Sequence, residues 1–211
     1  MSDIKDYRTD YGQQELNRKD LPENPIKLFD SWLQEAMHTI ESDANAFTLS
    51  TVGANAFPSS RVLLLKEAND KGFVFFTNYK SLKGKEMELN PKVALNFFWP
   101  SLEKQVRIQG IVEKISNVES DSYFQSRPYK SRVGAWASEQ SSSLESRDIL
   151  DKRYSQFCKK FSEYVPRPPH WGGYLVKPQT IEFWQGRSNR LHDRFSFRFV
   201  EGKWIAVRLA P

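Results

Sequence analysis

Residues 46–78, AFTLSTVGANAFPSSRVLLLKEANDKGFVFFTN, decide the fold class of this 211-residue chain. The runs AFTLSTV, SSRVLLLK and GFVFFTN are rich in β-branched and aromatic residues, and Gly, Asn, Pro and Asp separate them. This arrangement is typical of antiparallel strands joined by turns. The run SSRVLLLK is predicted to bury its four consecutive apolar residues and to keep Arg61 and Lys66 at its two ends.

Further strand-like runs follow: KVALNFFW, KQVRIQGIVEKI, GGYLVKP, QTIEFWQG, RFSFRFV and KWIAVRL, with Glu201-Gly202 as the predicted hairpin turn. Helices are expected from residue 25 to 40, from 81 to 90, from an N-cap at Asn117 to about Arg127, and from about 144 to 161. Crossover helices between successive strands are scarce. The pattern therefore predicts a mainly β fold with α-helices, an antiparallel barrel with peripheral helices rather than a parallel βαβ fold.

The chain shows no repeat and no break in composition that would mark a second domain. Residues 1–24 are polar and irregular and are predicted to form an N-terminal arm, so that 25–211 form a single domain. Cys158 is the only cysteine, which excludes an internal disulfide and favours a reducing compartment. Because no secretory signal or membrane-spanning segment is evident, a cytoplasmic protein is expected.

Charge and motifs narrow the function classes only in part. The net charge of +5 suits an anionic small ligand about as well as a nucleic acid. Glycine loops for dinucleotides or nucleoside triphosphates are missing, as is the GxSxG motif of hydrolases. His38 and His170 have no partner at metal-ligand spacing, so no metal is expected.

The stretch from Trp184 to Arg194, WQGRSNRLHDR, concentrates cations around one histidine. In an extended segment Arg190, His192 and Arg194 would share one face, and their mutual repulsion would favour a bound anion. The alternative is that these arginines pair with Asp193 or with a distant carboxylate.

A second cluster is formed by Tyr123, Arg127 and Ser131, which are spaced four residues apart. A phenol, a guanidinium and a hydroxyl that converge would form a phosphate cradle. Ordinary spacing on a helix surface is the competing explanation. Lys83, Gln105 and the Gln140-Ser141 pair are further polar candidates, and each is also typical of a solvated surface.

Taken together, several segments resemble the pyridoxine/pyridoxamine 5′-phosphate oxidase family from about Tyr7 to Pro211. They are RVLLLK, FFTN followed by SLK, the Gln105 strand, YFQSRP, GAWAS with QSS, WGGY, EFWQGRSNRLHDR and the terminal RLAP. The resemblance implies an FMN-binding split β-barrel of antiparallel Greek-key type, working as a homodimer with FMN at the subunit interface. It implies oxidation of pyridoxine 5′-phosphate or pyridoxamine 5′-phosphate to pyridoxal 5′-phosphate, with O2 as acceptor and H2O2 released. Ammonia would also leave the amine substrate, in vitamin B6 salvage and pyridoxal phosphate biosynthesis.

The resemblance also assigns the site residues. The FMN positions are Arg61, Val62, Leu63, Leu64, Leu65, Lys66, Phe76, Thr77, Lys83, Gln105, Gln140, Ser141, Trp184 and Arg194. The substrate positions are Arg8, Tyr11, Lys66, Tyr123, Arg127, Ser131, Arg190, Leu191 and His192. Arg190 and His192 would be catalytic and cover the pyridine ring, the stretch from Arg8 to Tyr11 would fold over the substrate, and Arg187 is interpreted as a turn residue.

Two positions depart from the family pattern: Leu82 stands where an arginine is usual, and Phe76 where a tyrosine is common. A lost charge-assisted donor at a phosphate costs on the order of 1.5–3 kcal/mol, so weaker FMN binding is expected. Lys80 or Lys85 are candidates for compensation.

Two other protein classes are compatible with this composition. One is a flavin protein on the same barrel with no such activity, which would be yellow but form no aldehyde. The other is a nucleic-acid-binding barrel, which would bind single strands in a salt-dependent way. The intact set of substrate positions argues against the first, and the second, prompted by the basic pI and abundant aromatic residues, ranks behind it.

Overall fold

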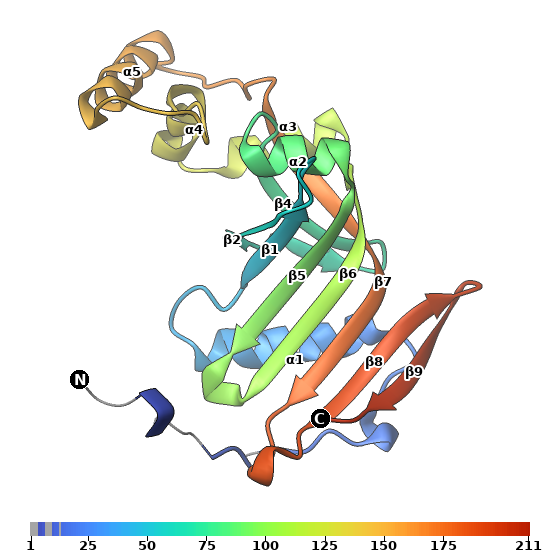
Figure 1. Cartoon of the computed structure of the whole chain (residues 1–211). Coiled ribbons are helices and arrows are strands. Elements are labelled where there is room, and N and C mark those ends of the chain that lie inside the picture. Colours follow the sequence, from blue (N-terminus) through green and yellow to red (C-terminus); the bar gives the residue numbers. More distant parts are fainter. Residues whose placement is uncertain (1–3, 7–9, 13) are drawn as a thin grey trace.

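The computed structural model describes residues 4–6, 10–12 and 14–211 (Figure 1). Its strands are β1 (Ala46–Val52), β2 (Pro58–Leu64), β3 (Glu67–Asn69), β4 (Gly72–Asn78), β5 (Lys92–Trp99), β6 (Lys104–Lys114), β7 (Trp171–Gln185), β8 (Asp193–Val200) and β9 (Lys203–Leu209). Its α-helices are α1 (Pro25–Thr39), α2 (Leu82–Leu89), α3 (Asn117–Ser126), α4 (Tyr129–Ala137) and α5 (Arg147–Lys160). No helix among these is long and apolar enough to cross a membrane.

All nine strands belong to one antiparallel sheet. The hydrogen-bonded order is β2-β1-β5-β6-β7-β4-β3, and β8 and β9 continue outward from β7. The predicted antiparallel, mainly β fold with helices is therefore confirmed. The sheet is open, however, because its path ends at β2 and β3 and does not close into a barrel. The split-barrel and Greek-key description stays a prediction.

β7 is the strand on which the sheet depends. Its first residues pair with β4, most of its length pairs with β6, and its last residues pair with β8. The sequence predicts two separate strands here, GGYLVKP and QTIEFWQG, with the break after Pro178. Pro178 is tolerated because the pairing register shifts there, between Gln109 and Gly110 of β6, and such a bulge does not require the missing proline N–H.

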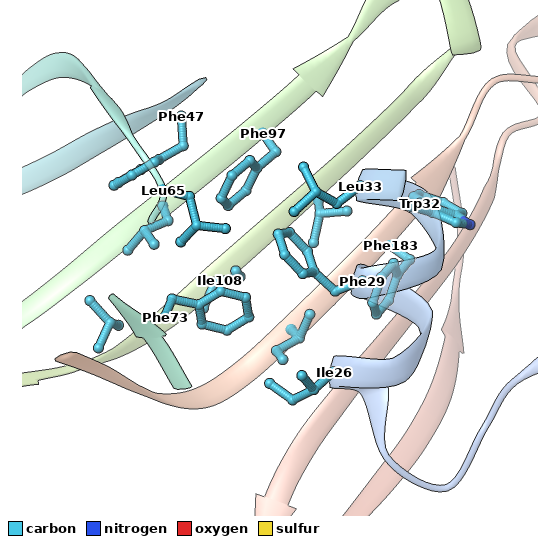
Figure 2. Packing of buried hydrophobic residues seen from close by; sticks show 14 of the residues in the cluster. Ile26, Phe29, Trp32, Leu33, Phe47, Leu65, Phe73, Phe97, Ile108 and Phe183 are labelled. Carbon is cyan, nitrogen blue, oxygen red and sulfur yellow. The ribbon is translucent and has the colours of Figure 1, made fainter. Parts of the chain in front are cut away.

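Helix α1 covers one face of the sheet and forms the core with it (Figure 2). Asn24 caps its first turn by accepting a hydrogen bond from the Ile26 N–H, and Pro25 follows at the first helical position. The Phe29 ring lies 4.9 Å from the rings of both Phe73 and Phe97. Burying such a side chain stabilises the fold by about 1.5–3 kcal/mol. The helix expected from residue 25 to 40 is confirmed in α1. Its apolar residues at helical spacing, Phe29, Trp32, Leu33 and Ala36, are buried, whereas Met37 is 55% exposed.

The opposite face of the sheet is polar and partly exposed. One cross-strand row on it runs through Val62, Thr48, Asn96, Arg107, Glu182, Ser196 and Val207. The expectation that β2 buries four apolar residues is wrong, because Val62 is 67% and Leu64 is 38% exposed and only Leu65 is buried among them. β2 is an end strand with one face on this outer surface, so its side chains alternate in burial.

The helices differ from expectation in two places. The N-cap of α3 is Ser116 rather than Asn117, since Ser116 and Glu119 form a reciprocal capping box. Helix α4 follows Pro128 and was not expected, and α5 begins at Arg147, later than predicted. Helices α4 and α5 project beyond the sheet next to α3 (Figure 1).

Candidate functional site

A cavity of about 670 Å³ lies at the start of β7, between β2, β4, α3 and α4. Trp171 forms part of its wall. Its lining includes ten of the predicted site residues: Val62, Leu63, Leu64, Lys66, Phe76, Thr77, Tyr123, Arg127, Ser131 and Gln140. Residues from segments 60–80 and 120–140 thus converge, as the resemblance implied.

Arg127 is held in this cavity by aromatic rings. It ends α3 as the C-cap, because Pro128 stops the helix, and its guanidinium lies 4.5 Å from the Trp171 ring centre and 5.5 Å from that of Phe124. Its Nη1 atom is buried and has no hydrogen-bond partner among the described residues. Burial lowers the pKa of Arg127. A buried donor without a partner is unfavourable, so this guanidinium is prepared for an anion.

The other two members of the cradle approach from either side of Arg127. Tyr123 stacks on Phe76 at 3.8 Å between ring centres, and Ser131 lies in the first turn of α4. Phe76, which stands where a tyrosine is common in the family, has no hydroxyl group, and its ring stacks on Tyr123.

Lys83 is a second cation prepared for an anion. It lies in the first turn of α2, which Ser81 caps, and it is only 7% exposed. Its Nζ donates to Gln140 Oε1 at 2.9 Å and to Ser81 Oγ at 3.3 Å, both neutral groups. Burial, assisted by the nearby charge of Arg61, lowers the pKa of Lys83 to about 8, although Glu86 acts in the opposite direction. A buried ammonium beside a helix N-terminus fits a phosphate group such as that of FMN.

Arg61, in contrast, has a carboxylate partner. Its Nη2 lies 3.2 Å from Glu86 Oε2, and Glu86 also accepts hydrogen bonds from Thr51 and Ser59. Burial alone would raise the pKa of Glu86, but these hydrogen bonds and the charge of Arg61 outweigh it and lower the pKa. Leu82, where an arginine is usual, is 52% exposed.

Lys80 and Lys85 are both exposed, and their predicted compensation for Leu82 stays untested. Leu65 is buried in the core, and Ser141 lies in the loop after α4 with a positive φ of 72°. Arg8 falls outside the described residues.

A second group of predicted residues lies at the other end of β7. Gln105 of β6, Trp184 of β7 and Arg194 of β8 are direct neighbours in register. The His192 ring centre is 4.6 Å from that of Trp184, and the Tyr11 ring lies 5.8 Å from both.

The expectation that Arg190, His192 and Arg194 alternate along an extended segment is wrong. A 3-10 turn, Ser188–Arg190, interrupts the chain, and Asn189 and Arg190 adopt left-handed φ angles of 56° and 61°. Arg194 lies in β8 and donates to Glu182 Oε1 at 2.8 Å and to the Ala210 carbonyl at 2.7 Å. The competing explanation, a carboxylate partner, is therefore confirmed for Arg194, while Arg190 and Leu191 are exposed.

His192 is held in place by Arg187, which the sequence predicts to be a turn residue. Its Nδ1 accepts a hydrogen bond from the Arg187 backbone N–H at 3.1 Å, so the neutral imidazole carries its proton on Nε2. Burial and the nearby charge of Arg190 lower the pKa of His192. No spacing pattern in the sequence identifies this contact.

The two groups are far apart in one chain. At about 3.3 Å per residue, β7 spans roughly 40 Å between Trp171 and Trp184, and Figure 1 shows the helices near its start and the β8–β9 hairpin near its end. One chain therefore brings the phosphate cradle together with Lys83 but does not bring Gln105, Trp184 or His192 to them. Within the described part of the chain, His, Cys, Asp and Glu form no group of three or more that could hold a metal ion.

Comparisons with known proteins point to the same family over most of the chain. Residues 33–159 match the family described as pyridoxamine 5′-phosphate oxidase, and residues 171–211 match the pyridoxine 5′-phosphate oxidase C-terminal dimerisation region. Proteins named pyridoxine/pyridoxamine 5′-phosphate oxidase from Actinobacillus succinogenes and Ralstonia pickettii are 52% and 50% identical to this chain. Those alignments cover 99% and 100% of this chain and 100% of each relative.

Solved structures show the same fold. PhzG from Burkholderia lata, in complex with tetrahydrophenazine-1-carboxylic acid, has a TM-score of 0.90 and 27% identity, covering 95% of this chain and 100% of that one. An FMN-binding protein from Nostoc punctiforme, described as related to pyridoxamine 5′-phosphate oxidase, has a TM-score of 0.72 and 14% identity, covering 90% and 100%. At that identity the second similarity concerns the fold alone.

Proposed function

Because this chain belongs to the pyridoxine/pyridoxamine 5′-phosphate oxidase family and is an FMN-dependent oxidoreductase, we propose that it forms pyridoxal 5′-phosphate. Its substrates are pyridoxine 5′-phosphate and pyridoxamine 5′-phosphate, O2 accepts the electrons, H2O2 is released, and the amine substrate also yields ammonia. The role is vitamin B6 salvage and pyridoxal phosphate biosynthesis. The observation that carries the proposal is the buried Nη1 of Arg127, which has no hydrogen-bond partner in the described part of the chain and lies in a cavity also lined by Tyr123 and Ser131.

In this proposal Lys66, Tyr123, Arg127 and Ser131 hold the substrate phosphate. A charge-assisted hydrogen bond from Arg127 fixes the substrate in one orientation, which reduces the entropic part of the activation barrier. Lys83, Thr77 and Gln140, which already share hydrogen bonds, hold the FMN phosphate with Arg61 beside them. FMN supplies the hydride chemistry when bound.

The remaining residues would come from a second copy of the chain. Gln105, Trp184, Arg194, Arg190 and His192 lie too far from the cradle of their own chain, whereas an isologous dimer can place them against the cradle of the partner. The match of residues 171–211 to a dimerisation region supports a homodimer. The outer face of the sheet, with exposed Val62 and Val207, supplies apolar surface for it. We therefore propose that FMN lies at the subunit interface.

The residues at the end of β7 would cover the substrate ring. Arg190, Leu191 and His192 would exclude water from the reacting carbon, with Tyr11 of the arm packed on His192. The neutral His192 can donate a hydrogen bond through Nε2 to the substrate. Residues 25–211 would form one FMN-binding split-barrel domain, residues 1–24 an arm that includes Arg8, and a cytoplasmic location remains a prediction.

Mixing two impaired variants tests the shared site. Arg127→Ala and His192→Ala subunits, each strongly impaired alone at limiting substrate, are unfolded together and refolded. If the two residues act across the interface, half of the dimers are mixed and each has one intact site, so about a quarter of wild-type activity returns. If both residues act within one chain, every site retains a lesion and no activity returns, which would contradict the proposal.

One further measurement separates the rival function. PhzG, at 27% identity, was solved in complex with tetrahydrophenazine-1-carboxylic acid, a compound whose anionic group is a carboxylate. Purified protein should show flavin absorption bands and form an aldehyde from pyridoxine 5′-phosphate. A yellow protein that forms none would mean a flavoprotein with another substrate.

A further inference from the structure

The described part of the N-terminal arm is bound to Glu103, just before β6, and to Asp193, at the start of β8. The Gly12 N–H donates to Glu103 Oε2 at 2.9 Å, and the Leu16 N–H donates to Asp193 Oδ2 at 3.2 Å. Directly before Gly12, Tyr11 packs its ring edge against Trp184 and His192. The arm therefore lies directly on the residues proposed to cover the substrate.

Gly186 makes this approach sterically possible. A Cβ atom at Gly186 would lie 3.0 Å from Tyr11 Cβ and Cγ and 2.9 Å from Glu103 Cβ. These Tyr11 atoms are next to the backbone and cannot swing aside as the end of a long side chain would. A side chain at this position would therefore require Glu103 to shift and Tyr11 to move by a few tenths of an ångström, which disturbs the docking of the arm.

Arg187 joins the arm to the segment through its guanidinium. Nη2 lies 2.6 Å from Glu15 Oε1 in the arm, and Nη1 lies 3.6 Å from Asp193 Oδ2 at the start of β8. Asp193 in turn accepts from Arg208 of β9 at 2.9 Å. Arg187 thus connects three separate parts of the chain, while its own backbone N–H holds His192 Nδ1.

We propose that Arg187 is a positioning residue, which fastens the N-terminal arm through Glu15 and holds His192 with Nε2 as its hydrogen-bond donor. The inference rests on the proposed function and deepens it, because it assigns a role to a residue outside the family's site positions. Arg187 touches neither substrate nor FMN in this scheme and acts only through Glu15, Asp193 and His192. With Nδ1 occupied, His192 orients the substrate and does not remove its proton.

The charges around His192 fit this role. Arg190 lies in the 3-10 turn that precedes His192, and Asp193 follows His192 in the chain. Tyr11 packs on the imidazole ring from the arm. Arg187 pairs with both Glu15 and Asp193. Protonation of Nδ1 would remove the acceptor of the Arg187 N–H. Release of the arm would expose the imidazole and move its pKa upward toward the ordinary value, because burial is the main cause of its lowering.

The first experiment compares Arg187→Ala, Arg187→Lys and the control Arg147→Ala in the FMN-loaded protein. Arg147 forms only an exposed pair with Asp151 on α5. Because exposed ion pairs contribute little, Arg187→Ala should raise KM about two- to five-fold with a smaller change in kcat. Lysine should restore part of the loss, and Arg147→Ala should behave as wild type.

A second readout is independent of activity. The chain has three histidines, so ¹⁵N-labelled histidine gives three resolvable imidazole spin systems, and His192→Asn identifies one. In the wild type, His192 should show a single Nε2–H tautomer and a lowered pKa. In Arg187→Ala the pKa should move upward, and in Glu15→Gln by a similar amount. The double variant Glu15→Gln/Arg187→Ala should add little further, since both changes remove one contact.

Gly186→Ala tests the arm without changing charge. It should reproduce the Arg187→Ala effects on KM and on the His192 titration, with a larger amplitude. Wild-type titration of His192 in both Gly186→Ala and Arg187→Ala would overturn the positioning role. Absence of aldehyde formation in every protein, with the His192 shifts intact, would instead refute the proposed substrate and leave the positioning role standing.

Discussion

The two ends of β7 treat positive charge in opposite ways. Near Trp171, as far as the structure describes the chain, Arg127 has a buried Nη1 without a partner and Lys83 is bonded only to neutral groups. Near Gln185, Arg187 and Arg194 both have carboxylate partners. At the start of β7, Arg127 and Lys83 thus have no carboxylate partner among the described residues, although Arg61 and Arg167 are paired there. At the end of β7, carboxylates of the same chain neutralise Arg187 and Arg194.

This difference indicates that the start of β7 binds a ligand, whereas the end of β7 has a structural role. Unpaired buried cations are unfavourable in the folded chain and become favourable when an anion arrives, so the start of β7 is organised to bind phosphate. Paired cations hold their elements together, so the end of β7 mainly fixes the shape of a surface. Four substitutions or conditions would break or sharpen this contrast.

The largest effect is expected at Arg127. Arg127→Ala should lower kcat/KM for pyridoxine 5′-phosphate roughly 10- to 150-fold, mainly through KM, because a charge-assisted bond contributes about 1.5–3 kcal/mol. Steady-state kinetics with unphosphorylated pyridoxine provides the control. An equal loss with that compound would show that the substitution damages the fold rather than phosphate binding.

Adding a cation at the start of β7 should strengthen FMN binding. Leu82→Arg restores the charge that is usual in the family, and a gain of about 1.5 kcal/mol would tighten FMN roughly ten-fold. Quenching of FMN fluorescence measures the dissociation constant. Leu89→Arg adds the same charge at the exposed far end of α2 and should have little effect. Equal tightening by both would point to net charge instead of a local contact.

FMN affinity should also depend on pH through Lys83. Its pKa without FMN is about 8, and a bound phosphate raises it, so binding takes up a proton above pH 8 and is unaffected well below it. Between pH 7 and 8.5 the dissociation constant should rise about four-fold. Lys83→Gln should bind FMN more weakly and flatten this dependence. A slope that persists in Lys83→Gln would assign it to another group.

The smallest effect is expected where charge is already paired. Glu182→Gln leaves Arg194 without its carboxylate and should lower the free energy of unfolding by about 0.5–1 kcal/mol in urea denaturation. Glu113→Gln removes an exposed partner of Lys177 and serves as the matched control, with almost no change. Identical losses in the two variants would mean that the Glu182 pairs contribute nothing specific.

Periodicity and turn chemistry predicted much of the fold. The apolar spacing of α1 and the Glu201-Gly202 turn between β8 and β9 are local signals, and both are confirmed. Helix α4 was missed because YKSRVGAWA has little apolar periodicity and is held by tertiary contacts around Trp136. The continuity of β7 was missed because Pro178 usually ends a strand, and only the partner strand reveals the bulge.

The site was predicted less completely than the fold. Resemblance placed Tyr123, Arg127 and Ser131 together, and the structure confirms that they line one cavity. Burial of Lys83 and the unpartnered Arg127 Nη1 depend on packing from distant segments, which residue types do not encode. Arg187 was missed because its partners, Glu15 and His192, are set by the docked arm and by a backbone hydrogen bond.

The long pairings of β7 also determine when this protein can fold during synthesis. β4 and β6 are both made long before β7, since Thr77 pairs with Gly172 and Val106 pairs with Phe183. At roughly 5–20 residues per second, β4 waits on the order of ten seconds on the ribosome with an unpaired edge. Such edges invite aggregation, so the nascent chain is most vulnerable late in translation, until β7 emerges and closes both gaps at once.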